Sequence, residues 1–504
     1  MLPCQSVEEI GPYTGTATPM PRPTPTRLPL RPLALMVGLA LAGSAQATDL
    51  WTVARDALEN DASLAAARSG FSVVEAGRDI QRGTLLPQVS LGSSLSHSRT
   101  YQSQSGEGQA SGVLPPGQAP RDDDDSVNSL GVSLDASQAV YDPARRAQLA
   151  QAERQVDREV LSLAVAEQQL LLEVAEAYFE ILRAHDILSA RRSQETAIER
   201  QLEQARERFE VGLIAITEVH EAQASFDLAR AQRIAAESAM QVSFEALERL
   251  TGQRYQSIDG LAEEIPIVPP EPMERGDWVE LAMANSPMLQ MAEAGVEVAR
   301  SELEVSRAGQ KPRLEAFASY DYSDNDRSGV SGYNSGSQLG LRASMPLYTG
   351  GSTQAQIRQS GFALEVSQYD FEAQRRDTIQ QVRSLFTRVT NDVETVEARA
   401  QAIVSNRSAL EATRSGYEVG TRNIVDVLNA ERNLFNAIAD HAEARYDYVL
   451  GLLRLQQQAG LLDAESIQAV NAWLQEESAV SLELPAVGNQ DPVMNIGARP
   501  RSPS

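Results

Sequence analysis

Polar and charged side chains that could form hydrogen bonds or ion pairs gather at two similar places in the chain. The first group contains Thr217 and Glu218, and the second contains Arg422, Asp426 and Asn429. The second group is spaced by four and then three residues, which places its members on one face of a helix. Such a face can bind a neighbouring segment or line a path for ions. The plainer alternative is an ordinary i,i+4 ion pair between Arg422 and Asp426 on a solvated surface.

Covalent catalysis has few candidate residues. The chain has four histidines, and none has a partner at the spacing of a metal site. HExxH, paired-cysteine, nucleophile-elbow and GxxxxGK[ST] patterns do not occur. The acidic run from Asp122 to Asp125 could bind a cation, but it lacks EF-hand spacing and is interpreted as a solvated loop. We therefore expect no enzyme, no metal and no cofactor.

Charge and composition limit the possible partners. The formal net charge is −25, from 69 acidic and 44 basic residues, and Lys311 is the single lysine. No basic stripe is available to neutralise phosphates, so nucleic acid is not an expected partner. Aromatic residues make up 5% of the chain and the mean hydropathy is −0.30, which is little core material for one compact globule.

Residues 1–47 are predicted to contain a signal peptide. Three arginines precede an apolar run over residues 33–42, and Ala45-Gln46-Ala47 follows as a cleavage site. The apolar run is too short to span a bilayer as a helix. Cys4 is the one cysteine and lies in the segment expected to be removed, so the mature chain would have neither a disulfide nor a lipid-anchoring cysteine.

The rest of the chain reads as two repeats of one pattern. Each repeat contains a helix, two strands joined by a loop, a long helix, a glycine turn and a returning helix. The predicted divisions are a first repeat at 48–252, a Pro-rich linker at 253–275, a second repeat at 276–460, and a short amphipathic piece with a disordered tail at 461–504. The predicted elements of the first repeat are a helix at 50–83, strands at 87–99 and 130–141 and a long helix at 143–209. Those of the second are strands at 314–322 and 338–348 and a long helix at 352–416.

Each returning helix starts just after a glycine that suits a chain reversal. Gly212 and Gly420 can take positive φ without steric cost, so each can end the incoming long helix. Thr217 and Glu218 are expected to supply an N-cap and an early carboxylate to the first outgoing helix. Asn423 and Asp426 are expected to do the same for the second.

The strands and the long helices point to an assembly of several copies. Each predicted strand has roughly 9 to 11 residues and alternating apolar side chains, as in a strand that crosses an outer membrane. Four strands cannot close a barrel, whereas twelve from three copies can. The long helix at 143–209 shows heptad spacing and must pack lengthwise on neighbours, and the long helices together predict a second, helical cylinder.

RFEVGLIAITEV at 208–219 and YEVGTRNIVDVLNAERNLFNA at 417–437 resemble the TolC family of outer-membrane channels. The resemblance extends from Leu50 to about Leu474. It implies an α+β membrane protein: a homotrimer with a 12-strand β-barrel, four strands from each chain, continued by a long periplasmic α-helical barrel. It further implies a passive exit duct in the outer membrane of a Gram-negative bacterium. The alternative from another class is a soluble periplasmic coiled-coil scaffold or adaptor.

The resemblance also assigns residues at the tips. The family's periplasmic gate latch falls on Thr217, Glu218, Tyr417 and Arg422. Its pore constriction carries two successive aspartate rings. Asp426 keeps the first ring, and Asn429 replaces the second.

The family implies partners as well. A periplasmic adaptor (membrane fusion) protein would dock on the tips, and an inner-membrane ABC or RND-type pump would drive export. The docking positions are Val211, Gly212 and Leu213 in the first tip and Val419, Gly420 and Thr421 in the second. Protein secretion and drug efflux stay open as alternatives.

Overall fold

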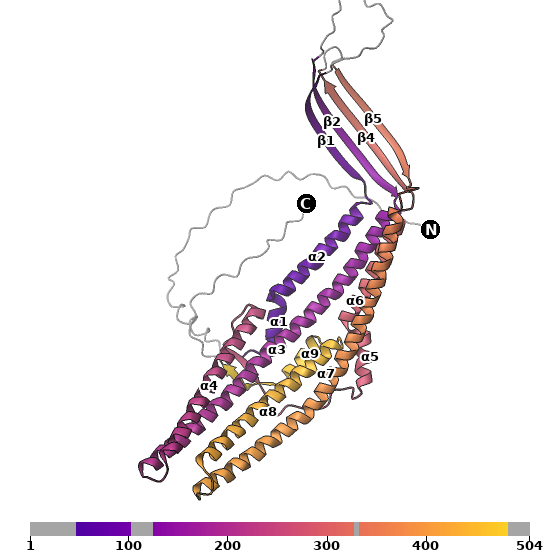
Figure 1. The fold of residues 1–504 in the computed structure, drawn as a ribbon. Coiled ribbons are helices and arrows are strands. Elements are labelled where there is room, and N and C mark those ends of the chain that lie inside the picture. The colour runs from indigo at the N-terminus through magenta and orange to yellow at the C-terminus, as the bar shows by residue number, and fades with distance from the viewer. Residues whose placement is uncertain (1–46, 102–123, 327–331, 482–504) are drawn as a thin grey trace, which may run out of the picture. The chain divides into compact units, whose positions relative to one another are not determined.

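The structure is a computed structural model that describes residues 47–101, 124–326 and 332–481 (Figure 1). The predicted signal peptide before Ala47, most of the predicted acidic loop and the end of the predicted tail lie outside the described residues. The first set of elements is α1 (Leu50–Asn60), α2 (Ala62–Gly83), β1 (Gln88–Tyr101), β2 (Asp124–Tyr141), α3 (Pro143–Glu210), α4 (Ile216–Thr251) and β3 (Ser257–Leu261). The second is α5 (Arg275–Asn285), α6 (Pro287–Ala308), β4 (Arg313–Asn325), β5 (Gly332–Ser344), α7 (Ser352–Glu418), α8 (Ile424–Gln458), α9 (Ala464–Asn471) and β6 (Leu474–Ser481).

Two long helices dominate the fold. They are α3 with 68 residues and α7 with 67, so each is about 100 Å long at 1.5 Å per residue. Asp142 starts α3 by accepting hydrogen bonds from the amides of Ala144 and Arg145 at 3.0 and 3.1 Å, with Pro143 at the first helical position. α3 packs on α4, α6 and α8, and α7 packs on α6 and α8. None of the described helices has an apolar stretch long enough to cross a membrane.

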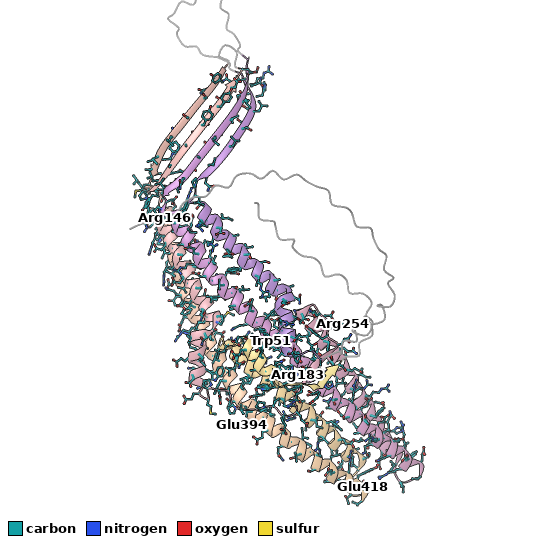
Figure 2. The ribbon with its side chains drawn as sticks, turned by 180° about the vertical axis from the view of Figure 1, so that it is seen from behind. Trp51, Arg146, Arg183, Arg254, Glu394 and Glu418 are labelled. Atoms are coloured by element: carbon teal, nitrogen blue, oxygen red, sulfur yellow. The ribbon has the colours of Figure 1, made fainter. Side chains whose placement is uncertain are left out.

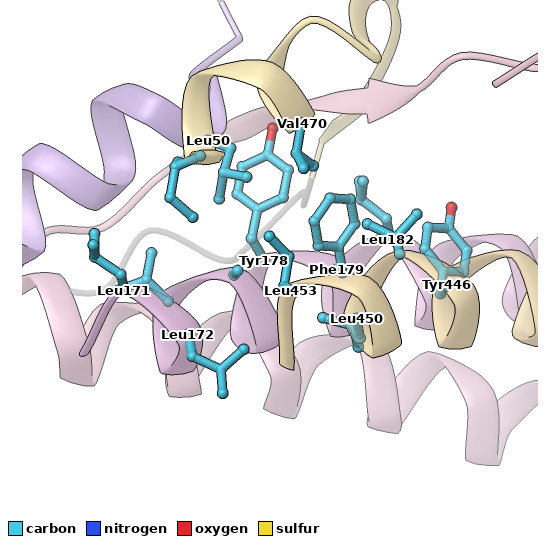
Figure 3. Packing of buried hydrophobic residues seen from close by; sticks show 14 of the residues in the cluster. Leu50, Leu171, Leu172, Tyr178, Phe179, Leu182, Tyr446, Leu450, Leu453 and Val470 are labelled. Carbon is cyan, nitrogen blue, oxygen red and sulfur yellow. The ribbon is translucent and has the colours of Figure 1, made fainter. Parts of the chain in front are cut away.

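The main hydrophobic core lies where α1, α3, α8 and α9 meet (Figure 3). Phe179 of α3 packs on Tyr446 of α8 with ring centroids 6.3 Å apart, and Tyr178 bonds the Thr48 and Asp259 carbonyls. On the predicted heptad face of α3, Ala177 is half-buried and the other apolar residues from Leu170 to Leu188 are buried. Figure 3 also labels other residues of this core, namely Leu50, Leu171, Leu172, Leu182, Leu450, Leu453 and Val470.

Four of the strands form one antiparallel sheet in the order β1-β2-β4-β5. They contain 14, 18, 13 and 13 residues and are longer than predicted. The register sets Leu91 opposite Leu134 and Leu134 opposite Tyr320, so apolar side chains share one sheet face, and all three are exposed. β5 ends at Ser344, before the predicted limit, and Asp124 and Asp125 lie in β2 instead of the predicted loop.

Two further expectations were wrong. The predicted helix at 50–83 is divided at Asp61, whose extended backbone ends α1 and whose carboxylate caps α2 by accepting from the Leu64 amide at 2.8 Å. The start of the predicted disordered tail is β6, which pairs with β3 of the linker. Gly260 is needed there, because a Cβ would lie 2.0 Å from the Ser478 carbonyl oxygen.

Candidate functional site

The first hairpin tip joins α3 to α4 through a glycine turn. Val211 caps α3, and Gly212 follows with φ +77°. The Gly212 amide donates to the Phe209 carbonyl at 2.9 Å, and the Leu213 amide donates to the Arg208 carbonyl at 2.8 Å. These bonds satisfy carbonyls that the end of a helix leaves without partners.

The second tip joins α7 to α8 in nearly the same way. Val419 is the cap and Gly420 has φ +78°. The Thr421 amide donates to the Gly416 carbonyl at 2.8 Å, and its hydroxyl donates to the same oxygen at 3.0 Å. Figure 2 labels Glu418 at this tip. The predicted role of both glycines as left-handed turn residues is therefore confirmed.

The tips present apolar side chains to solvent. Val211, Leu213 and Val419 are 70%, 73% and 75% exposed. A Cβ added to Gly212 or Gly420 would meet no atom within 4 Å. Each tip is thus a small apolar knob, and its glycine is required by backbone conformation instead of by close packing.

The returning helices start differently in the two tips. α8 has a capping box in which the Asp426 amide donates to Asn423 at 2.8 Å and the Asn423 amide donates to the Asp426 carboxylate at 3.4 Å. The expected cap at Thr217 was wrong. Ala215 is the N-cap of α4, and Thr217 is the second helical residue, so Glu218 alone supplies the acidic first turn.

Tyr417 and Glu218, from different repeats, meet between the two tips. The Tyr417 hydroxyl donates to a Glu218 carboxylate oxygen at 3.5 Å. The Arg208 guanidinium lies over the Tyr417 ring, 4.9 Å from its centroid. Burial and the Glu218 carboxylate raise the pKa of Tyr417, and Arg208 acts in the opposite direction. The phenol therefore stays protonated and can donate at neutral pH.

Arg422 has a different partner in the single chain. Its guanidinium lies 3.8 Å from the Asp426 carboxylate and its side chain is 61% exposed. Within the described residues it makes no hydrogen bond or ion pair with Thr217 or Glu218. The structure thus brings Tyr417 to Glu218, pairs Arg422 with Asp426, and does not bring Arg422 to Thr217 or Glu218 within the described chain.

The predicted pore face carries a cation that the sequence reasoning missed. Asn429 accepts a hydrogen bond from the Arg432 guanidinium at 2.5 Å. Asp426 and Asn429 are both half-buried in the single chain, whereas Arg432 is exposed. The spacing of three residues on one helix face was the signal that could have identified Arg432. Arg208 and Glu431 were missed as well, because their partners lie on other helices.

The described part of the chain shows no arrangement of side chains typical of a metal site or of acid–base catalysis. The described residues contain no group of three or more His, Cys, Asp or Glu placed to hold a metal ion. His441 is partly buried, and burial together with Arg445 lowers its pKa. His185 is half-buried on α3, and its ring nitrogen Nδ1 lies 3.3 Å from a carboxylate oxygen of Asp186, its neighbour in sequence. The tips offer hydrogen bonds, an ion pair and apolar contact surface.

Comparison with known proteins identifies the family. The family described as Outer membrane efflux protein matches residues 53–253 and 278–461. The chain is 34% identical over 451 residues to the outer membrane protein TolC of Vibrio cholerae, covering 88% of this chain and 98% of that one. It is 30% identical to TolC of Escherichia coli, covering 94% and 95%. It is also 34% identical to the alkaline protease secretion protein AprF of Pseudomonas aeruginosa, covering 63% and 66%.

Solved structures share the fold. The channel CusC matches with a TM-score of 0.68 at 15% identity, covering 82% of this chain and 92% of that one. The outer membrane protein VceC of Vibrio cholerae matches with a TM-score of 0.66 at 17% identity, covering 82% and 96%. The predicted resemblance is confirmed over most of the chain, and a channel is favoured over a soluble scaffold. The chain belongs to the outer membrane efflux protein family and is an outer-membrane channel of the TolC type.

Proposed function

We propose that three copies of this chain form an outer-membrane exit duct that is closed at its periplasmic end by the hairpin tips. An adaptor and an inner-membrane pump would open it to export proteins, small toxic compounds or both. The observation that carries the proposal is the pairing of the two tips of one chain through Tyr417 and Glu218 at 3.5 Å. Signal-peptide cleavage after Ala47 would deliver the chain to the periplasm of a Gram-negative bacterium.

The sheet supports a barrel made from several copies. β1 and β5 each have one neighbour in the sheet, so both edges have free backbone groups. In lipid, unpaired amides and carbonyls are costly, and pairing β5 of one copy with β1 of the next would satisfy them. Three copies then give a closed barrel of twelve strands. Its outer face would be the apolar face that carries Leu91, Leu134 and Tyr320.

The long helices support lengthwise packing between copies. α7 exposes Phe362, Val366 and Tyr369, which are spaced by four and three residues and therefore share one face. Large apolar side chains on one stripe of a helix favour burial against another helix. A neighbouring copy in a homotrimer would cover this stripe and complete the periplasmic helical barrel.

The gate would combine contacts within and between copies. Tyr417 bonds Glu218 within one chain, and the exposed Arg422 would reach Thr217 or Glu218 of the next copy. Partly exposed polar pairs contribute roughly 0.5 to 1 kcal/mol each, so six per trimer give about 3 to 6 kcal/mol. Moving a gate from 1:99 to 99:1 takes about 5.5 kcal/mol. Such a latch is firm at rest and can be released by a binding partner.

The apolar knobs at the tips would receive the adaptor. Val211, Gly212 and Leu213 form the first knob, and Val419, Gly420 and Thr421 form the second. Val211 and Leu213 in the first knob and Val419 in the second are 70 to 75% exposed, so a trimer would present six knobs with apolar side chains. The pump would supply the energy, as no phosphate-cradling loop occurs in the sequence.

The constriction would carry a single carboxylate ring. Three Asp426 side chains would face the pore, with Asn429 in the position of the second ring. Arg432, bonded to Asn429, adds positive charge next to it. This duct would have a weaker preference for cations, and weaker block by polyvalent cations, than a channel with two aspartate rings.

Two experiments test the proposal. Membrane fractionation should place the protein in the outer membrane, and a heat-modifiable band on a gel should show that it is a trimer. A purely soluble protein would favour the periplasmic scaffold instead. Deleting the gene and comparing the secreted proteome with dye and antibiotic sensitivity should separate the two cargo classes. Loss of secreted proteins would indicate type I secretion, and increased sensitivity would indicate efflux.

A further inference from the structure

A fully buried carboxylate lies near the hairpin tips. Glu431 has 0% exposure, whereas the next two residues of the helix, Arg432 and Asn433, are exposed. One of its oxygens, Oε1, accepts a hydrogen bond from the Arg414 guanidinium at 2.6 Å and another from the Gln201 side-chain amide at 3.2 Å. Gln201 is itself nine-tenths buried. Charged groups are rarely buried unless they are paired, so this arrangement calls for an explanation.

The three residues come from three helices and both hairpins. Glu431 is on α8 and Arg414 is on α7, so this ion pair lies within the second hairpin. Gln201 is on α3, so its bond to Glu431 joins the second hairpin to the first. A motion that separates the hairpins would break the Gln201 bond and keep the Arg414 bond.

The second carboxylate oxygen makes the site sensitive to such a motion. Oε2 of Glu431 is buried and has no hydrogen-bond partner among the described residues. The carboxylate thus depends on the two donors at Oε1 for its stability inside the bundle. Removing a hydrogen-bond donor from a buried charged group costs free energy, because water does not replace the lost donor.

The site is separate from the latch at the tips. Gln201 lies nine residues before Glu210, the last residue of α3, which is about 14 Å along the helix. Arg414 lies one turn before Tyr417 on α7. The hairpins of one chain are therefore held at two levels, by Tyr417 and Glu218 near the turns and by Gln201 and Glu431 further from them.

We propose that Glu431 is a positioning residue of the gate, which holds the second hairpin against α3 through Gln201 and thereby favours the closed state. The inference rests on the proposed gating function. Arg414 compensates the buried charge, and Gln201 makes the bond that opening breaks. Glu431 does not line the transport path and does not contact the cargo.

The test uses the purified full-length channel in planar lipid bilayers without an adaptor. Glu431→Gln weakens the acceptor and places an NH₂ group where Oε2 has no partner. Gln201→Leu keeps the volume and the Arg414 ion pair but removes the bond between hairpins. Glu443→Gln, an exposed glutamate on the same helix, is the matched control. Resistance of the unboiled trimer to SDS and helix content report whether each variant is folded.

Each of the two test variants should raise the resting open fraction about tenfold, as expected for loss of one hydrogen bond to a charged group. The control should match the wild type. The double variant Gln201→Leu/Glu431→Gln should exceed the stronger single variant by less than about twofold, since both changes remove the same contact.

The outcomes separate the inference from the gating function. Wild-type protein that forms no channels would refute the proposed function itself. A conducting wild type with unchanged resting conductance in Gln201→Leu would overturn the role of Glu431, whether or not Glu431→Gln folds. An increase in Glu431→Gln without any increase in Gln201→Leu would also overturn it, because the effect would then arise within the second hairpin.

Discussion

The hydroxyl of Tyr417 and the carboxylate of Glu218 lie 3.5 Å apart although 199 residues separate them in sequence. The two residues stand at the tips of two hairpins with the same backbone turn. Tyr417 is the donor, Glu218 is the acceptor, and Arg208 covers the aromatic ring. The tips thus have the same backbone turn and complementary side chains.

Removing the Tyr417 hydroxyl should loosen the closed state. In Tyr417→Phe the ring still packs beneath Arg208, but Glu218 loses its donor. We expect the resting open fraction in planar bilayers to rise roughly twofold to fivefold, from a loss of about 0.5 to 1 kcal/mol. Tyr348→Phe, which removes a hydroxyl from an 89% exposed tyrosine far from the tips, is the control. Equal resting conductance in the two variants would refute the contribution of this bond.

Restoring a carboxylate at the constriction should change ion selectivity. Asn429→Asp adds one negative charge per chain to the face of Asp426, so cation preference and block by polyvalent cations should both increase. A change of about 1 kcal/mol corresponds to roughly fivefold tighter block. Arg432→Gln should change selectivity in the same direction, because it removes a cation bonded to Asn429. Unchanged reversal potential and unchanged block in both variants would show that this face does not line the pore.

A half-buried carboxylate on α7, that of Asp392, should make stability depend on pH. Burial, and secondarily the Asp447 carboxylate, raise the pKa of Asp392 above its ordinary value of 3.8, while Arg388 opposes the shift. The folded protein therefore binds the Asp392 proton more tightly than the unfolded chain, and this contribution to stability is lost as pH rises through the folded-state pKa. Asp392 Oδ2 is also buried without a partner in the described structure.

Asp392→Asn should consequently raise the melting temperature in detergent at pH 7. The difference from wild type should shrink below pH 3.8, where the wild-type carboxyl is protonated in both states. Thermal unfolding of both proteins at pH 7 and pH 3.5 checks this. A difference that is equal at the two pH values would show that titration of Asp392 does not cause it.

A charge on an apolar knob should weaken adaptor binding without altering the resting gate. Leu213 is 73% exposed, so Leu213→Glu should fold normally while losing the burial of a leucine in the complex, a cost of about 1.5 to 3 kcal/mol or at least tenfold in affinity. Leu213→Ile is the conservative control. Binding of the purified adaptor by surface plasmon resonance provides the measurement, and equal affinity for both variants would place the docking surface elsewhere.

Much of the fold could be predicted from the sequence, because the spacing of apolar residues in helices and strands is a local feature. The 68 residues of α3 were predicted to within one residue at the end, since Asp142 and Gly212 mark the limits of an uninterrupted helical pattern. β6 was missed because its partner, β3, lies more than two hundred residues earlier, and nothing nearby predicts that pairing. The break at Asp61 was missed because the alanine-rich sequence around it looks like one continuous helix. Asp61 both ends α1 and caps α2.

The candidate site was predictable in its turns and less so in its contacts. Gly212 and Gly420 follow from helix-ending chemistry, and Asn423 follows from capping preferences. Glu431 could not be found from spacing, because its burial depends on how α3, α7 and α8 pack. The pair of Arg422 and Asp426 was the plainer alternative that the i,i+4 spacing offered, and the single chain shows it at 3.8 Å. A contact of Arg422 with Thr217 depends instead on the distance between hairpins, which local sequence does not encode.

Cross-linking the two tips tests the central claim most directly, that the hairpins must separate for transport. The one native cysteine, Cys4, lies in the predicted signal peptide, so Glu218→Cys with Tyr417→Cys would place the only two thiols of the mature chain at the tips. A short bifunctional thiol reagent would then join them, and either single-cysteine variant is the control. The account predicts that cross-linked channels lose adaptor-driven export and stay at their resting conductance. Full export by completely cross-linked protein would contradict it.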